Sequence, residues 1–124
     1  MNKKDFYLGI AKAVAQRSSC LRAKYGAVIV RDDRIVSVGY NAPAVGEKHC
    51  IVCLREMKGV KHGSSYEEWC PAIHAEENAI INAGRERCMG GTLYLWGTRS
   101  SKPCYRCVRI IKNAGIEKVV INES

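Results

Sequence analysis

The sequence lacks the features that would place the chain in or across a membrane. No apolar run approaches the roughly 18–20 residues that a membrane-spanning helix needs. The opening stretch, MNKKDFYLGIAKAVAQR, carries Lys3 and Lys4 but has neither the long apolar core nor the cleavage site of a signal peptide. It predicts an amphipathic helix of the mature domain. We therefore expect a cytoplasmic protein with no membrane partner.

Long charged blocks, internal repeats and low-complexity linkers are absent too. The net charge is +8, but no block reaches five or six like charges, so no charged interaction tail is indicated. A net positive charge favours binding of polyanions such as nucleotides or nucleic acid, and it is equally consistent with a mildly basic protein without such a partner. With 124 residues, 47% of them apolar, the chain predicts one domain over residues 1–124, built on a single core.

Helical and strand patterns alternate along this domain. Periodicity and turn residues predict helices over 5–19, 71–83 and 103–113, and strands over 25–30, 34–40, 92–96 and 116–121. The first two strands form a hairpin around Asp32 and Asp33, whereas residues 48–70 are polar, without clear periodicity. Helix–strand alternation in the second half favours a parallel pair with a right-handed crossover. The prediction is an α/β fold with a mixed sheet flanked by helices.

Cysteine is the residue type present in excess. Seven cysteines are many for this length, and without a secretion signal they favour metal binding over disulfides. Two CxxC pairs stand out, Cys50/Cys53 and Cys104/Cys107. Taken alone, a CxxC pair is often half of a structural zinc site or a redox pair.

The stretch AIHAEENAI, residues 72–80, places His74 and Glu76 at the start of an otherwise apolar helix. His74 and the Cys104/Cys107 pair both lie at helix starts, which gather at one edge of the sheet in a layered α/β unit. One histidine and two cysteines form a tetrahedral zinc site with an open fourth position. Glu76 is then close enough to carry a proton from a water activated by zinc. The alternative for His74 and Glu76 is an ordinary helix start, with a capping histidine and a glutamate that favours the helix dipole.

The combination HxE…PCxxC is the signature of zinc-dependent nucleobase deaminases. The chain resembles the cytidine deaminase superfamily, and within it the deoxycytidylate (dCMP) deaminase branch. The resemblance covers nearly the whole chain and is carried by SSCLRAKYGAVIV at 18–30, GYNAP at 39–43, HCIVCLRE at 49–56, CPAIHAEENAI at 70–80 and KPCYRC at 102–107. It implies a three-layer fold with about four to five strands.

The resemblance also implies the reaction and its residues. A pyrimidine nucleotide, dCMP, would be hydrolysed to dUMP and ammonia by hydroxide attack at C4. His74, Cys104 and Cys107 would hold the catalytic zinc, and Glu76 would shuttle protons. The backbone at Ala75 would bind the base, and Asn41 would contact a sugar hydroxyl, although an asparagine after a strand is also an ordinary turn residue.

Some members of this branch carry a second, structural zinc. The resemblance implies Cys20, Cys50, Cys53 and Cys70 as its four ligands, with His49 or His62 as a substitute for one thiolate. Such an ion would organise residues 48–70, which have too little apolar content to order themselves. The alternative is that some of these cysteines are buried free thiols.

The sequence departs from the branch in two places. Ala42 replaces the glycine of the usual GYNG run, which argues against regulation by deoxynucleoside triphosphates. The chain stops at Ser124, where the superfamily usually continues into another helix and strand, so we expect oligomer contacts over the exposed edge.

Two other functions stay open. One is deamination of a cytosine nucleoside, a modified pyrimidine nucleotide or a tRNA adenosine. The other is a non-catalytic, zinc-stabilised nucleic-acid-binding module, for which Glu76 would have no use.

Overall fold

The computed structural model describes residues 1–51, 53, 57, 59, 72–99 and 102–123. Among these residues, helices and strands alternate as the sequence predicts, with one short additional helix. The elements are α1 (Lys3–Ala15), β1 (Tyr25–Arg31), β2 (Arg34–Tyr40), α3 (Ala75–Ala83), α4 (Arg85–Cys88), β3 (Thr92–Gly97), α5 (Tyr105–Asn113) and β4 (Lys118–Ile121).

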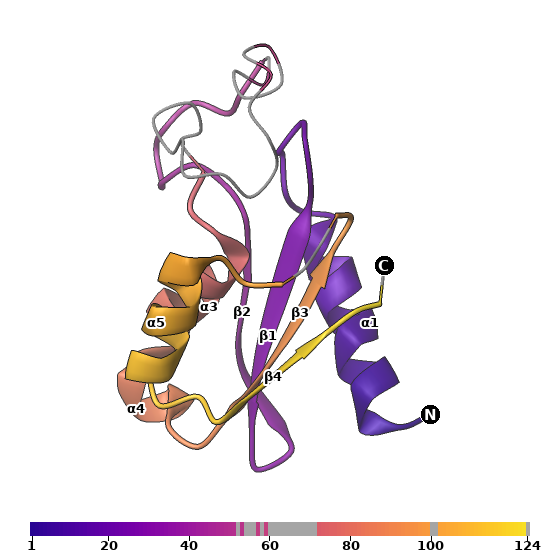
Figure 1. Ribbon diagram of the computed structural model, residues 1–124, viewed down its shortest axis with the longest axis vertical. Coiled ribbons are helices and arrows are strands. Elements are labelled where there is room, and N and C mark those ends of the chain that lie inside the picture. Colours follow the sequence, from indigo (N-terminus) through magenta and orange to yellow (C-terminus); the bar gives the residue numbers. More distant parts are fainter. Residues whose placement is uncertain (52, 54–56, 58, 60–71, 100–101, 124) are drawn as a thin grey trace.

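The strands form one mixed sheet of four in the order β2-β1-β3-β4 (Figure 1). Strand β1 lies antiparallel to both β2 and β3, whereas β4 runs parallel to β3. The predicted hairpin and parallel pair are therefore both confirmed. Asp32 and Asp33 have positive φ angles of 54° and 58°, as the two central residues of a type I′ hairpin turn require.

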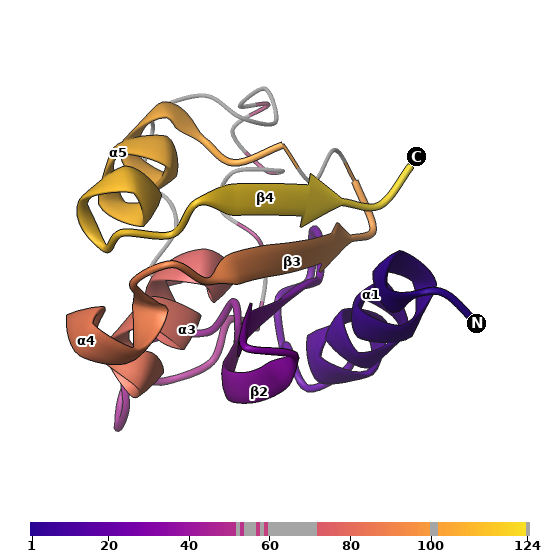
Figure 2. The ribbon, with the colours of Figure 1, turned by 90° about the horizontal axis from the view of Figure 1, so that it is seen from below.

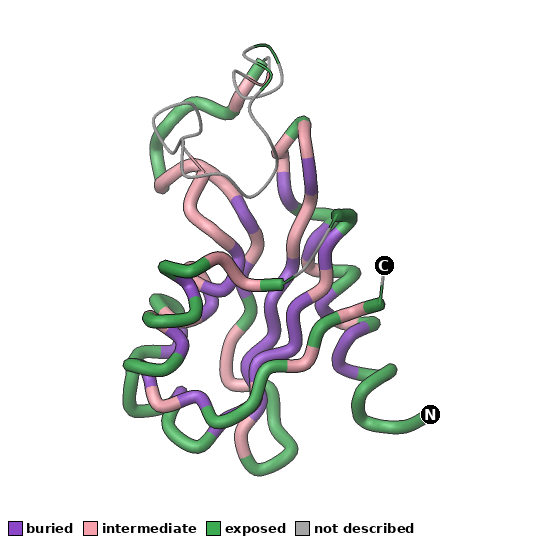
Figure 3. The backbone as a smooth tube through the Cα atoms, in the orientation of Figure 1, coloured by how far each residue is buried: buried purple, intermediate pink, exposed green. Residues whose placement is uncertain are grey.

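Helices cover both faces of the sheet, which gives three layers (Figure 2). Helix α1 packs on one face, while α3, α4 and α5 lie on the other. Successive residues of β1 enter opposite cores: Ala27 and Ile29 join the cluster with α3 and α5, and Val28 and Val30 join the cluster with α1. Burial on both faces explains why this strand is a continuous apolar run rather than an alternating one (Figure 3).

Two glycines allow the helices to approach the sheet closely. A Cβ at Gly39 in β2 would lie 2.6 Å from the Ala75 carbonyl oxygen and would also overlap the Ala79 amide nitrogen of α3. A Cβ at Gly26 in β1 would overlap the backbone of α1 in the same way, at Ala11. Gly39 therefore sets how deeply the helix that carries Glu76 sits on the sheet.

Helix boundaries differ most from the sequence prediction at two places. Helix α1 ends at Ala15 rather than Ser19, because Ser18 turns inward and its hydroxyl donates to the Asn41 carbonyl oxygen at 2.7 Å. Helix α3 begins at Ala75 rather than near residue 71, because Ile73 forms a β-bridge with Ala42. In the part of the chain that the structure describes, no helix has the length and apolar character needed to cross a membrane.

Candidate metal centre

His74 is the N-cap of α3, with extended backbone angles (φ −69°, ψ 153°). The segment before it is held by two backbone hydrogen bonds between Ala42 and Ile73, of 3.2 and 2.8 Å. The N–H group of His74 donates to Glu77 Oε1 at 3.1 Å, the backward bond that a carboxylate at the third helical position can make. The imidazole is therefore attached to a backbone segment that is held in place at the start of the helix.

Cys104 is the corresponding N-cap of α5 (φ −69°, ψ 166°), and its Sγ accepts from the Cys107 N–H at 3.4 Å. Cys107 lies in the first turn of α5 and is fully buried. Free N–H groups at a helix start favour a thiolate there, which is the form of cysteine that binds metals.

These two helix starts meet. His74 Nδ1 lies 3.2 Å from Cys107 Sγ and 3.6 Å from Cys104 Sγ, and all three atoms lie within 4.8 Å of one another. Typical zinc bond lengths and tetrahedral angles place a nitrogen and a sulfur ligand about 3.6 Å apart and two sulfur ligands about 3.8 Å apart. The three side chains thus fit a zinc ion with one open coordination position.

The electrostatics of the trio suit a cation. Hydrogen bonds from Cys107 and His74 lower the pKa of the Cys104 thiol to about 3. The contact with Cys104, together with burial, raises the pKa of Cys107. The contact with Cys104 also raises the pKa of His74, against the opposing effect of burial. Two sulfurs compete for one proton, and a divalent cation would replace it by binding both as thiolates.

Glu76 follows on the first turn of α3, and its side chain is buried with 5% exposure. It is the one buried carboxylate among the described residues. Burial raises its pKa, and the positive charge of His74 opposes that rise. A carboxyl group that is withdrawn from water beside a metal-ligand set is suited to proton transfer.

Asn41 is buried at the end of β2, with 7% exposure, and both atoms of its side-chain amide bind backbone. Its Oδ1 accepts from the Tyr25 N–H at 2.9 Å, and its Nδ2 donates to the Ala23 carbonyl at 2.9 Å. The asparagine therefore joins the entry of β1 to the end of β2. Its neighbour Ala42 forms the bridge to Ile73, so Asn41 lies one residue from the contact that holds the segment carrying His74 and the buried Ala75.

The second group of cysteines is described only in part. Cys20, Cys50 and Cys53 are half-buried, and Cys70 and His62 lie outside the described residues. Within the described ranges, three metal-ligating side chains gather only at His74, Cys104 and Cys107. Ser19 Oγ contacts His49 Nδ1, which joins the neighbours of Cys20 and Cys50.

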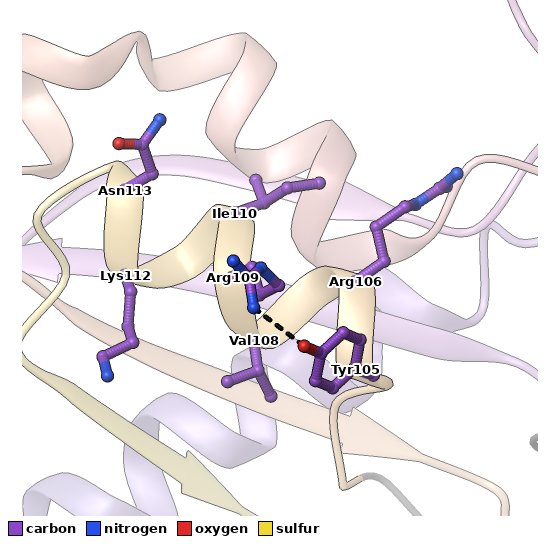
Figure 4. Close-up of a pocket in the computed structure, with 7 residues that line it drawn as sticks. All are labelled: Tyr105, Arg106, Val108, Arg109, Ile110, Lys112 and Asn113. Atoms are coloured by element: carbon purple, nitrogen blue, oxygen red, sulfur yellow. Dashed lines mark hydrogen bonds between the residues drawn. The ribbon is translucent and has the colours of Figure 1, made fainter.

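The pocket drawn in Figure 4 is not the metal centre. It lies on the outer surface of α5, and none of the three candidate ligands lines it. Its lining consists of Tyr105, Arg106, Val108, Arg109, Ile110, Lys112 and Asn113.

Sequence reasoning missed the residues that surround the ligands. Glu77 and Arg106 form an ion pair between α3 and α5, with Arg106 Nη2 3.0 Å from each carboxylate oxygen. The one available signal was the position of Glu77, three residues after a helix N-cap. No local pattern indicates the partner from a helix that follows much later in the chain.

Comparison with known proteins agrees with this geometry. Residues 1–123 match the family described as the cytidine and deoxycytidylate deaminase zinc-binding region. A deoxycytidylate deaminase of Mycobacterium phage D29 is 43% identical over 120 residues, which cover 94% of this chain and 91% of that protein. A deoxycytidylate deaminase of Schizosaccharomyces pombe is 33% identical over 97% of this chain, which spans only 37% of the yeast protein.

Solved structures show the same fold. The dCMP deaminase of cyanophage S-TIM5, in complex with dCMP and dUMP, is 26% identical with a TM-score of 0.71, and the match covers 98% of this chain and 82% of that one. The cytidine deaminase of Mycobacterium tuberculosis shares the fold at 18% identity and a TM-score of 0.60, over 99% of this chain and 86% of its own. Matched over almost its whole length, the chain belongs to the zinc-binding cytidine and deoxycytidylate deaminase family.

Proposed function

We propose that this protein catalyses the zinc-dependent hydrolytic deamination of dCMP to dUMP and ammonia, with residues 1–124 acting as a single catalytic domain. The family match over residues 1–123 supports the domain and the chemistry. The named activity of the phage D29 relative and the dCMP and dUMP bound to the cyanophage enzyme support the substrate.

His74, Cys104 and Cys107 would hold the zinc, which supplies Lewis-acid chemistry that makes water nucleophilic near neutral pH. Glu76 would take a proton from the attacking water and deliver it to N3 of the cytosine ring. It would then take the second proton of that water from the new C4 hydroxyl group and pass it to the departing amino group. Water oxygen becomes the new C4 carbonyl oxygen, and the nitrogen leaves as ammonia, so the reaction needs no further reactant.

The buried Glu76 carboxylate next to the ligand set is the observation that carries the proposal. A purely structural zinc site needs ligands that close the tetrahedron, not a buried acid beside three of them. A non-catalytic zinc module leaves the 5% exposure of this carboxylate unexplained. The same carboxylate has a direct use in proton transfer, which typically contributes about 10²–10⁴-fold to a rate.

We assign substrate contacts to Asn41 and to the backbone at Ala75, as the family resemblance implies. Asn41 already uses one hydrogen of its amide and one side of its carbonyl on backbone. An amide has two donor hydrogens and two acceptor positions, so a sugar hydroxyl can bind the remaining ones. Ala75 is the first residue of α3, between His74 and Glu76.

We also propose a second, structural zinc at Cys20, Cys50, Cys53 and Cys70. The contact between Ser19 and His49 supports it, because it brings the segments of the first two cysteines together. Metal analysis of the purified protein would test it: two zinc ions per chain are expected, and a single ion, retained in a Cys50→Ser/Cys53→Ser variant, would reject the second site.

A homo-oligomer is the third part of the proposal. Val119 and Ile121 of β4 are 38% and 37% exposed, and β4 is one of the two edge strands of the described sheet. An apolar edge strand left bare promotes further association, and a second copy would cover it. Light scattering should give a mass that is a multiple of the chain, and a monomer at micromolar concentration would refute this.

The substrate is tested by ammonia release from dCMP, deoxycytidine and cytidine, measured side by side with zinc-loaded protein. Release from dCMP well above the other two is the expected result. Release from the nucleosides alone would show that the substrate is a nucleoside rather than dCMP, while the deamination reaction itself would stand. No release from any of them would reject the proposed substrate class.

A further inference from the structure

One carboxylate connects the two halves of the metal centre. Glu77 Oε1 accepts the N–H of His74 at 3.1 Å, and both Glu77 oxygens accept from Arg106 Nη2 at 3.0 Å. Arg106 lies between Cys104 and Cys107 in the sequence. The backbone of the histidine ligand is thus joined through Glu77 to the helical turn that carries both cysteine ligands.

The environment of this ion pair differs from that of an ordinary surface pair. The Glu77 side chain is only 14% exposed, although Arg106 is 54% exposed. Exposed pairs contribute little because water competes for both charges. Here the carboxylate is mostly withdrawn from water and receives charge-assisted bonds from one direction and a backbone bond from another, which fixes its orientation.

A neighbouring arginine on the same helix provides a direct contrast. Arg109 hydrogen bonds to the Tyr105 hydroxyl at 2.8 Å, and its guanidinium lies 5.4 Å from the Tyr105 ring. Both residues belong to α5, so that contact connects no second element. Figure 4 shows Arg106 pointing away from the Arg109–Tyr105 pair.

We propose that Glu77 and Arg106 are positioning residues that hold the starts of α3 and α5 at the separation zinc requires. The inference rests on the zinc site proposed above and assigns neither residue a contact with metal or substrate. The two nitrogen–sulfur distances, 3.2 and 3.6 Å, are close to those of a tetrahedral zinc site, so a small separation of the two helix starts would move the ligands out of reach of one ion. Groups that orient metal ligands typically change metal affinity or activity by about 10–100-fold when they are replaced.

The test uses Glu77→Gln, Arg106→Gln and the double variant in the full chain. Glutamine at 77 keeps an oxygen for the His74 N–H but loses the charge that binds Arg106. Zinc affinity, measured by competition with a chromophoric chelator, should weaken about 10–100-fold in each single variant. The double variant should bind zinc no more weakly than the single variant with the lower affinity, because both changes remove the same interaction.

Cobalt substitution adds a readout that a general loss of stability would not change. The visible absorption bands of Co²⁺ report the geometry and sulfur ligation of the molecules that remain folded. We expect the bands to shift or weaken in both single variants, and Arg106→Lys to restore them in part. Arg109→Gln, which removes the same charge one turn further along α5, should match wild type.

Two outcomes separate failure of the inference from failure of the site. Wild-type protein that binds no Co²⁺ with tetrahedral, sulfur-ligated bands would reject the zinc site itself. Normal wild-type bands together with unchanged zinc affinity and unchanged bands in Arg106→Gln would overturn the positioning role. Because Arg106 is half exposed, Arg106→Gln should fold normally, and it therefore tests the positioning role even if Glu77→Gln folds poorly.

Discussion

Replacing Asn41 with alanine should destabilise the fold far more than a typical polar substitution. The change removes the acceptor of the Tyr25 N–H and the donor to the Ala23 carbonyl, each at 2.9 Å in a buried or half-buried setting. A buried polar group that loses its partner costs about 1–3 kcal/mol. Two such groups, partly rescued by water at the less buried one, predict a loss of about 2–4 kcal/mol in the free energy of unfolding.

The assay is urea unfolding of zinc-loaded protein, followed by circular dichroism. With a slope of about 2 kcal/mol per molar urea, the midpoint should fall by roughly 1–2 M at unchanged slope. Asn82→Ala is the matched control: its Nδ2 also donates to a backbone carbonyl, that of Val38, at 2.8 Å, but in an exposed position. It should change stability by no more than about 0.5 kcal/mol.

An Asn41→Ala midpoint equal to that of Asn82→Ala would refute the structural role. The proposed sugar contact is tested separately, at low urea where the variant is folded. If Asn41 also binds the sugar, kcat/KM for dCMP should fall by more than the folded fraction explains. A value proportional to the folded fraction would remove Asn41 from the substrate site and leave its structural role intact.

Two further predictions concern helix packing and the metal. Gly39→Ala should lower the free energy of unfolding by about 1–3 kcal/mol, because its Cβ would lie 2.6 Å from the Ala75 carbonyl oxygen. Gly9→Ala in α1, where a Cβ meets nothing within 4 Å, should raise it by roughly 0.5–1 kcal/mol. Equal urea midpoints for the two variants would contradict the close approach of α3. Chelation should abolish ammonia release and lower the thermal midpoint, and added zinc should restore both; full activity in chelator at zero residual zinc would contradict a metal-dependent reaction.

The sequence was most informative where a structural feature depends on residues that are adjacent in the chain. Strand β1 was predictable because five successive buried residues form one apolar run, and the turn at Asp32 and Asp33 has residues that tolerate positive φ. The cluster of candidate ligands was predictable because each of the three lies at a helix start, and such starts gather at one edge of a layered sheet.

Long-range contacts explain what the sequence could not predict. The start of α3 depends on the bridge between Ala42 and Ile73, and no periodicity in either segment indicates that pairing. For Asn41 the sequence suggested a sugar contact or an ordinary turn residue but not its two backbone bonds, since its partners Ala23 and Tyr25 become neighbours only in the folded sheet.

Glu76→Gln separates a catalytic role of the buried carboxylate from a purely structural one. The substitution removes the carboxylate that would carry the proton and keeps the size of the side chain, while His74, Cys104 and Cys107 stay in place. Zinc content and ammonia release from dCMP should be measured on the same preparation as wild type. We expect unchanged zinc content and a loss of about 10²–10⁴-fold in kcat. Wild-type turnover in a zinc-loaded Glu76→Gln protein would contradict the catalytic role.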